Sequence, residues 1–347
     1  MPIQTQNTNA QRIGRAKGEM LAHAMQVEVA AKFADPIPME KNKSDTLVMR
    51  RYLPFGATTA SINAQNRPVV NPLTHQTAEG ITPNADTLVP FDITVTAQQY
   101  MVLYSYTDRV YNLNEEDIPK EMVIQTGERM GLLREMIRFG ELRSCTNAFY
   151  AGGTTIGTTA QIIGPAQLGR VSIVLRANRA KMITKILDSS ASYNTTFVEA
   201  GYVVLCHTDL EFDIRALPDF REVASYGNRK PLHEMELGSW GLYRFILTPE
   251  FAPYADQGAT VASTGLFSTT GTNIDVYPII VMGADAFGEV ALRTMKSFTM
   301  IDVPLSTKSK SDPGNQRGYI GAKLYAAARI KNAGWMAVLH VGRTNLG

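Results

Sequence analysis

The chain has 347 residues, of which 44% are hydrophobic and 19% charged, and its formal net charge is +2. This length allows one large domain or a few small ones with a substantial core. The longest nearly uncharged apolar runs, residues 276–286 and 335–341, are much shorter than the roughly 20 residues that a membrane span needs. The N-terminus lacks the apolar stretch of a signal peptide. We therefore expect a chain made inside the cell, uncleaved and without a membrane anchor.

The N-terminal segment predicts an amphipathic helix. Residues 8–33 contain no proline, and their apolar side chains recur at helical spacing: Ile13, Ala16, Met20, Ala24, Val27 and Ala31. The sequence Asp35-Pro36-Ile37-Pro38 then stops the helix. Such a terminal helix has no evident core of its own, so we expect it to lie on a neighbouring subunit.

The stretch from Thr46 to Pro119 contains no lysine and only four arginines, and it predicts a long extended arm. An extended segment from Arg50 is followed by turn signals at Asn71-Pro72, Glu79-Gly80 and Thr82-Pro83. The alternation of Phe91, Ile93 and Val95 predicts a strand. Loops of this length are uncommon inside compact domains, so we expect the arm to reach another subunit.

Charge is divided unevenly along the chain. Residues 1–51 carry eight Lys or Arg against five Asp or Glu, whereas residues 52–119 carry two against seven. The opposite signs favour contacts between the arms of adjacent copies, but solvated faces that simply differ explain them equally well. No basic cluster is interleaved with aromatic residues, so the pattern does not indicate a reader of nucleic-acid sequence.

The strongest helix signal follows the arm. Asp117 is suited to cap a helix, and Pro119 fits the first turn. One side of the helix carries the stripe Val123, Thr126, Met130, Leu133 and Ile137, and the other side carries Glu121, Gln125, Glu128, Glu135 and Arg138. We predict a helix over about residues 118–147, which at about 1.5 Å per residue is a rod of about 40 Å.

The second half predicts a mixed α/β domain. A glycine- and threonine-rich turn at residues 151–159 precedes a helix at 167–187. Strands are predicted at 202–206, 242–247 and 276–282, and short helices at 209–217, 220–226 and 284–291. Residues 297–305 and 322–341 are strand-like, with Gly334 as the turn of a terminal hairpin. A small C-terminal sheet of this kind is well placed to pack on the long helix.

The sequence carries no motif of nucleotide-binding, nucleophile-elbow or zinc-protease chemistry. Two polar groupings would need to converge to form a metal or acid–base site: His207 with Asp209 and Glu211, and His233 with Glu234 and Glu236. We interpret both as surface residues at a strand end and in a loop.

The two cysteines, Cys145 and Cys206, have neither metal-ligand nor disulfide-framework spacing, and we expect inert buried thiols. The acceptor pattern Asn194-Thr195-Thr196 has no secretory signal beside it and is interpreted as a chance match. We therefore predict no catalytic, cofactor-binding or metal-binding residue, and no cofactor.

The order of these elements resembles phage major capsid proteins of the Hong Kong 97-like fold. Four short passages resemble more closely the major capsid proteins of N-four-like tailed phages: TAEGITP at 77–83, residues 99–108, VMGADAFG at 281–288, and DPGNQRG at 312–318 with Lys323. The resemblance covers most of the chain from about Arg50 onward. Residues 1–45 lie outside it.

The resemblance implies an α+β fold in four parts. These are an N-terminal arm with an amphipathic helix at residues 1–53, an extended loop at 54–95, a peripheral domain at 96–165 and 295–347 with the spine helix at about 118–147, and an axial α/β domain at 166–294. It also implies a structural protein, not an enzyme, that tiles an icosahedral shell as hexamers and pentamers around phage double-stranded DNA.

The partners that the resemblance implies are further copies of the chain, portal, scaffold and decoration proteins, and DNA contacted without sequence specificity, but no membrane. The implied location is the virion capsid, after assembly in the host cytoplasm. Two alternatives stay open. A cellular encapsulating shell of the same fold would enclose an enzyme, and an α/β enzyme would need His207, Asp209 and His233 to meet in one cleft.

In the namesake of the fold, a lysine of the extended loop forms an isopeptide bond with an asparagine of a neighbouring subunit. This chain has no lysine between Lys43 and Lys120. We therefore predict a shell that is held together by non-covalent contacts.

Overall fold

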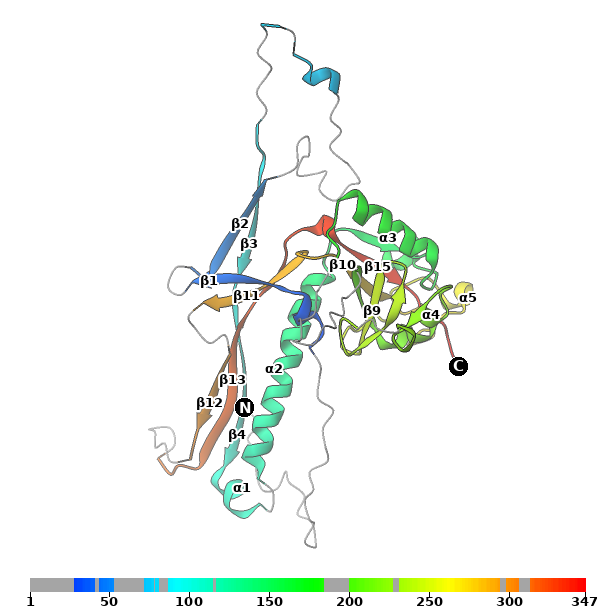
Figure 1. The fold of residues 1–347 in the computed structure, drawn as a ribbon. Coiled ribbons are helices and arrows are strands. Elements are labelled where there is room, and N and C mark those ends of the chain that lie inside the picture. The colour runs from blue at the N-terminus through cyan, green and yellow to red at the C-terminus, as the bar shows by residue number, and fades with distance from the viewer. Residues whose placement is uncertain are drawn as a thin grey trace, which may run out of the picture.

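The computed structural model describes residues 28–40, 44–52, 72–77, 79–80, 87–114, 117–183, 200–226, 231–293, 298–305 and 313–347. Figure 1 shows an elongated molecule, in which a layer of long strands with one long helix lies beside an α/β domain. This combination confirms the predicted α+β class. Within the described residues, no helix has the length and apolar character needed to cross a membrane.

The helices are α1 (Asp108–Leu113), α2 (Ile118–Leu142), α3 (Pro165–Ala177), α4 (Glu211–Arg215) and α5 (Val261–Thr264). The strands are β1 (Asp35–Glu40), β2 (Thr46–Tyr52), β3 (Pro90–Thr96), β4 (Gln98–Thr107), β5 (Ala148–Tyr150), β6 (Tyr202–His207), β7 (Arg221–Glu222), β8 (Glu236–Trp240), β9 (Tyr243–Thr248), β10 (Tyr277–Met282), β11 (Phe287–Arg293), β12 (Phe298–Val303), β13 (Arg317–Ala326), β14 (Ala328–Ile330) and β15 (Met336–Val341).

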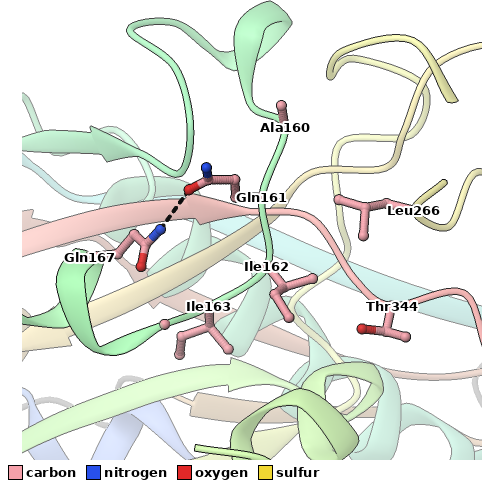
Figure 2. Close-up of a pocket in the computed structure, with 8 residues that line it drawn as sticks. Ala160, Gln161, Ile162, Ile163, Gln167, Leu266 and Thr344 are labelled. Atoms are coloured by element: carbon pink, nitrogen blue, oxygen red, sulfur yellow. Dashed lines mark hydrogen bonds between the residues drawn. The ribbon is translucent and has the colours of Figure 1, made fainter. Parts of the chain in front are cut away.

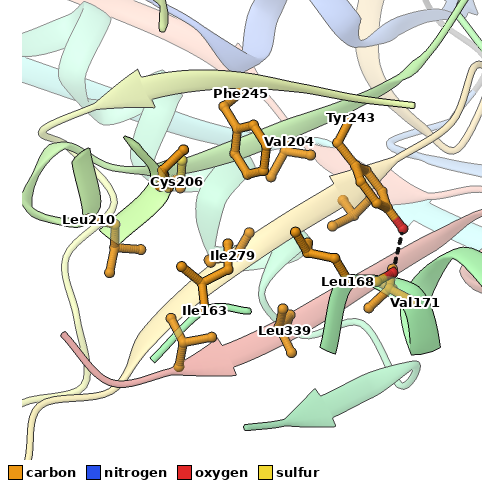
Figure 3. Close-up of a cluster of buried hydrophobic side chains, with 14 of the residues drawn as sticks. Ile163, Leu168, Val171, Val204, Cys206, Leu210, Tyr243, Phe245, Ile279 and Leu339 are labelled. Carbon is orange, nitrogen blue, oxygen red and sulfur yellow. Dashed lines mark hydrogen bonds between the residues drawn. The ribbon is translucent and has the colours of Figure 1, made fainter. Parts of the chain in front are cut away.

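The α/β domain is built on a seven-stranded sheet of order β5-β15-β10-β6-β9-β8-β7. Its central strands are buried along their whole length except for His207 at the end of β6, because both faces of the sheet are covered. Figure 3 shows one face, where Leu168 and Val171 of α3 pack on Val204, Ile279 and Leu339. The other face packs on the C-terminal end of α2 through Phe139 and Leu142. The predicted strands at 202–206, 242–247 and 276–282 are confirmed.

The long helix α2 is confirmed, with the Asp117 side chain accepting a 3.3 Å hydrogen bond from the backbone N–H of Lys120. It lies along the three-stranded sheet β12-β13-β4, where Met130 packs with Val102 and Leu324. The helix ends at Leu142 and not near 147, since residues 148–150 pair with β15 as a parallel strand.

The apolar stripe predicted for α2 is only partly right. Val123 is 42% exposed, while Glu135 and Arg138, which were expected on the solvent side, are each 1% exposed. The spacing of apolar residues did not reveal the burial of Glu135 and Arg138, because a second layer, made of the N-terminal segment and β11, covers this side of the helix.

The described end of the N-terminal segment packs against other parts of its own subunit. A 3-10 turn at Ala30–Phe33 leads into β1, which pairs in parallel with β11 and opposes Ile37 to Val290. The predicted helix over residues 8–33 falls largely on residues 1–27, which lie outside the described residues, and residues 28–33 are not α-helical. The expected arm at residues 1–53 therefore contains two strands, β1 and β2.

β2 and β3 form an antiparallel ladder from Thr46 opposite Thr96 to Tyr52 opposite Pro90. β3 and β4 are separated by Ala97 alone and run on as one long ribbon, so the ladder continues beyond the layer of α2 (Figure 1). The strand predicted from Phe91 is confirmed. Most of the expected loop at residues 54–95 lies outside the described residues.

The helix predicted at 284–291 is wrong, because β11 occupies Phe287–Arg293. β1 runs so close to Gly288 that a Cβ at this position would lie 2.8 Å from the carbonyl oxygen of Asp35. A residue without a side chain thus permits the parallel pairing, whereas the sequence pattern suggested a helix.

Three smaller predictions also need correction. The helix predicted at 167–187 ends at Ala177, and residues 220–226 form β7 and a 3-10 turn. Gly334 is not the turn of a terminal hairpin, since it lies in a 3-10 turn between β14 and β15, which belong to different sheets.

The sheets do not follow the expected domain ranges. β5 and β15 come from the ranges expected for the peripheral domain, 96–165 and 295–347, but both join the seven-stranded sheet. β11 comes from the expected axial range, 166–294, but pairs with β1 and β14. Strands from the expected peripheral ranges therefore join the seven-stranded sheet, and a strand from the expected axial range pairs outside that sheet.

Candidate assembly surfaces

The grouping around His207 is a local hydrogen-bonded structure. Its Nδ1 accepts a 3.1 Å hydrogen bond from the backbone N–H of Asp209, and burial is the main cause that lowers the His207 pKa. The Asp209 carboxylate accepts a 2.8 Å hydrogen bond from the hydroxyl of Tyr277 and lies 3.3 Å from Arg343. His207 Nδ1 lies 3.5 Å from Oδ1 of Asp209, but Glu211 pairs with Arg215, so the structure brings together two of the three predicted side chains and not the third.

The grouping around His233 has separate partners. The Nδ1 of His233 accepts a 3.1 Å hydrogen bond from the backbone N–H of Met235. The buried Glu236 carboxylate accepts hydrogen bonds from the Tyr226 hydroxyl at 2.8 Å and from Arg244 at 3.3 Å. Across the described residues, no group of three or more His, Cys, Asp or Glu side chains is placed to hold a metal ion.

Both cysteines are free and buried, as predicted. Burial raises the pKa of the Cys145 thiol to about 11 and raises that of Cys206 further. Because the thiolate is the reactive form, these positions are protected from nucleophilic and oxidative chemistry.

Within the described part of the chain, the β2–β3 ladder has one exposed face. Alternate residues point to opposite sides, and the side away from β1 exposes Val48 by 55% and Tyr52 by 59%. Between them, Arg50 donates hydrogen bonds of 2.7 and 2.8 Å to the two carboxylate oxygens of Asp92 on the opposite strand. A two-stranded ladder of this kind is marginally stable alone in water, so the exposed Val48 and Tyr52 side chains favour contact with another surface.

A groove of about 740 Å³ lies between the start of α2 and the strands β12 and β13. Its lining is mostly apolar or aromatic: Tyr106, Tyr111, Pro119, Val123, Met300, Pro304, Leu305 and Ile320, with Asp117, Lys120 and Asp302 as the charged members. Tyr111 is 57% exposed and Met300 43%. The groove is thus a mostly apolar surface at the opposite end of the strand layer from the β2–β3 ladder (Figure 1).

A shallower cavity of about 370 Å³ opens beside the start of α3 (Figure 2). Gln167 Nε2 donates a 2.9 Å hydrogen bond to Gln161 Oε1 at its rim, and Leu266 and Thr344 line the opposite side. None of its eight lining residues has a titratable side chain. This cavity therefore offers no acid–base or metal-binding chemistry of its own.

An ion network joins the N-terminal segment to the long helix. The Arg138 guanidinium lies 2.6 Å from Glu28, 3.1 Å from Glu135 and 2.7 Å from Glu289, which come from three different parts of the fold. Arg134 adds a 3.1 Å pair with Glu289.

Glu135 anchors this network to the backbone of the N-terminal segment. Its Oε1 accepts hydrogen bonds from the backbone N–H groups of Val29 at 3.2 Å and Ala30 at 2.9 Å. Burial is the largest influence on the Glu135 pKa and raises it, while these hydrogen bonds and Arg138 oppose the rise. The sequence signal for this anchor was the spacing of Glu135 and Arg138 within one helix turn, but the polar-face interpretation assigned both to solvent.

No family model matches the sequence, and no curated protein matches it. Solved structures match nearly the whole chain. The capsid of Ralstonia phage GP4 has a TM-score of 0.64 at 10% identity and covers 99% of this chain and 99% of its own. The cyanophage Pam1 capsid has a TM-score of 0.58 at 14% identity over 99% and 100%, and the head of Helicobacter pylori bacteriophage KHP40 has 0.58 at 13% over 98% and 97%. The chain has the fold of these phage capsid and head proteins, as the resemblance implied.

Proposed function

We propose that this chain is the major capsid protein of a tailed phage, and that it assembles as hexamers and pentamers into the icosahedral head around double-stranded DNA. The observation that carries the proposal is the end-to-end match to phage capsid chains, which covers 99% of this chain and 99–100% of theirs. The N-four-like branch is the finer assignment that the four sequence passages favour. The chain acts as a building block and not as an enzyme.

In this proposal, α2 and the sheet β12-β13-β4 form the peripheral domain, and the seven-stranded sheet forms the axial domain near the capsomer axis. The separation of the two sheets in the fold supports this division (Figure 1). Heterologous contacts between copies give rings where the rotation between neighbours closes. β5 and β15 carry the chain into the axial domain, and β11 links that domain to the N-terminal segment.

The extended loop, in this proposal, lies across a neighbouring subunit. Two features of the described residues support this. The exposed face of the β2–β3 ladder carries Val48 and Tyr52, and the groove beside α2 exposes Tyr111 and Met300. Both surfaces expose apolar or aromatic side chains that a shell would bury. Permanent interfaces commonly bury on the order of 2,000–5,000 Å², enough to keep subunits together without covalent bonds.

The proposed setting is the virion capsid, after assembly in the host cytoplasm, with portal, scaffold and decoration proteins as further partners and without a membrane. The enclosed DNA is contacted without sequence specificity. The absence of lysine between Lys43 and Lys120 supports a shell without loop-lysine cross-links.

Sedimentation of the purified full-length chain tests the proposal. We expect particles of megadalton size, and we expect the double variant Val48→Asp, Tyr52→Asp to remain as small species with unchanged circular dichroism. The matched control is Leu346→Asp, which alters an apolar residue that is 61% exposed outside the ladder and should still assemble. A wild-type chain that remains a monomer or a small discrete oligomer under all assembly conditions would overturn the proposal.

A further inference from the structure

The exposed side of α3 lies in a part of the chain without acidic residues. Residues 142–187 contain six Lys or Arg and no Asp or Glu, in a chain that otherwise mixes the two signs. An exposed face that carries one sign of charge creates a local potential that attracts polyanions.

The helix separates its buried and exposed sides cleanly. Leu168, Val171, Val174 and Leu175 are buried against the seven-stranded sheet. Arg170 and Arg176 are exposed on the opposite side, with Ile173 between them, and the exposed Arg179 follows the end of the helix. Figure 1 shows α3 on the outside of the α/β domain, where none of the described helices covers it.

These arginines have no carboxylate to neutralise them within the described part of the chain. The one ion pair that a cation of residues 142–187 makes there joins Lys181 to Asp285, at 3.5 Å. Arg170 instead lies over the Phe149 ring, 5.9 Å from its centroid, so the positive surface extends from α3 over the edge strand β5. Guanidinium groups in this state are available to an external anion.

We propose that the face formed by Arg170, Arg176 and Arg179 binds the phosphate backbone of double-stranded DNA. Arginine suits this role because its planar fork matches phosphate oxygens and stays charged at every relevant pH. Backbone contacts carry no sequence information, which agrees with the lack of a basic cluster interleaved with aromatics.

This inference rests on the proposed function, since an enclosed genome is the polyanion that a capsid chain meets. The competing occupant is a second copy of the chain, because Ile173 is 60% exposed between the two arginines and an apolar centre is typical of protein contacts. The charge of this face favours DNA over a second copy, because three arginines without a carboxylate partner in the described part of the chain surround a single exposed apolar residue, Ile173.

The test measures the affinity of dissociated full-length subunits for a fluorescent DNA duplex between about 50 and 200 mM NaCl. The logarithm of the binding constant falls with the logarithm of salt, with a slope of about −0.9 for each phosphate contact. We expect Arg170→Gln, Arg176→Gln, Arg179→Gln to reduce the slope by up to about 2.7. The charge-matched control replaces Arg109, Arg129 and Arg221, which are exposed elsewhere, and should keep the wild-type slope.

The same variants are also assembled into shells, which separates the two proposals. Equal slopes for wild type and the α3 variant, or an equal loss in the control, would overturn the DNA-binding face while the proposed function stands. An α3 variant that fails to assemble but binds DNA as wild type would show instead that the face meets a second copy. A wild-type chain that forms no shells contradicts the proposed function whatever the slopes.

Discussion

Arg138 donates two hydrogen bonds to the same oxygen of Glu289, from Nε at 3.0 Å and from Nη2 at 2.7 Å. These residues stand 151 positions apart in the sequence, on α2 and β11. The same guanidinium contacts Glu28 at 2.6 Å, so one side chain ties together the long helix, the inner strand of the β1-β11-β14 sheet and the N-terminal segment. The contact of α2 with β11 and the N-terminal segment is therefore ionic as well as apolar.

Replacing Arg138 by methionine should destabilise the subunit by about 3–5 kcal/mol, because it leaves buried carboxylates without their cation. The measurement is the free energy of unfolding in denaturant. Arg129→Met, at an exposed position of the same helix, is the control and should change the free energy by no more than about 0.5 kcal/mol. Equal effects of the two substitutions would mean that the network does not stabilise the fold.

His340 should make the subunit sensitive to mild acid. It is 3% exposed, its ring stacks on Tyr150 with centroids 5.0 Å apart, and burial lowers its pKa to about 4. The unfolded chain binds a proton near the ordinary pKa, whereas the folded chain does not. The stabilisation is therefore complete above about pH 6.5 and is lost as the pH falls toward the folded-state value.

The His340→Phe variant keeps an aromatic ring and removes the titration. Between pH 7 and pH 5, wild type should lose about 2 kcal/mol more unfolding free energy than this variant. Denaturant titrations at the two pH values provide the comparison. If the two proteins lose the same amount, His340 is protonated in the folded state and the assigned burial effect is wrong.

Two truncations separate the roles of the N-terminal residues. Removal of residues 1–45 should abolish folding, because it deletes β1 with the buried Ile37 and Met39. Removal of residues 1–27 keeps this core. If the N-terminal segment staples capsomers, as its amphipathic pattern predicts, shells of the shorter truncation should lose heat resistance, as measured by light scattering during heating. Normally sized and equally resistant shells would refute the staple.

Boiled particles should give a single band near the subunit mass of 38.1 kDa on a denaturing gel. The physical reason is the absence of a lysine between Lys43 and Lys120 to form an isopeptide bond. A ladder of multimers that survives boiling and reduction would show covalent cross-links and refute the prediction.

Features with a local cause were predictable from the sequence. The cap at Asp117 and the run Tyr202–Cys206 have short-range signals, namely a capping side chain before an apolar stripe and a continuous apolar run. β11 was not predictable, because its parallel partner β1 lies about 250 residues earlier and the apolar spacing within 284–291 fits a helix equally well. The long-range pairing with β1 makes this segment a strand and not a helix.

The burial of Glu135 and Arg138 was hidden for a related reason. A charged residue on a helix is normally assigned to solvent, and its burial becomes evident only when the compensating groups are known. Here the compensating groups are Glu28, Glu289 and two backbone N–H groups of the N-terminal segment. The sequence predicted an extended arm that contacts another subunit. It did not predict the groove beside α2, because the groove depends on the packing of β12 and β13 against the helix.

Electron microscopy of the purified full-length chain tests the central claim most directly. The proposed function predicts closed shells of uniform diameter with icosahedral symmetry, built from hexamers and pentamers. A homogeneous preparation of small discrete oligomers, or of monomers, would contradict it.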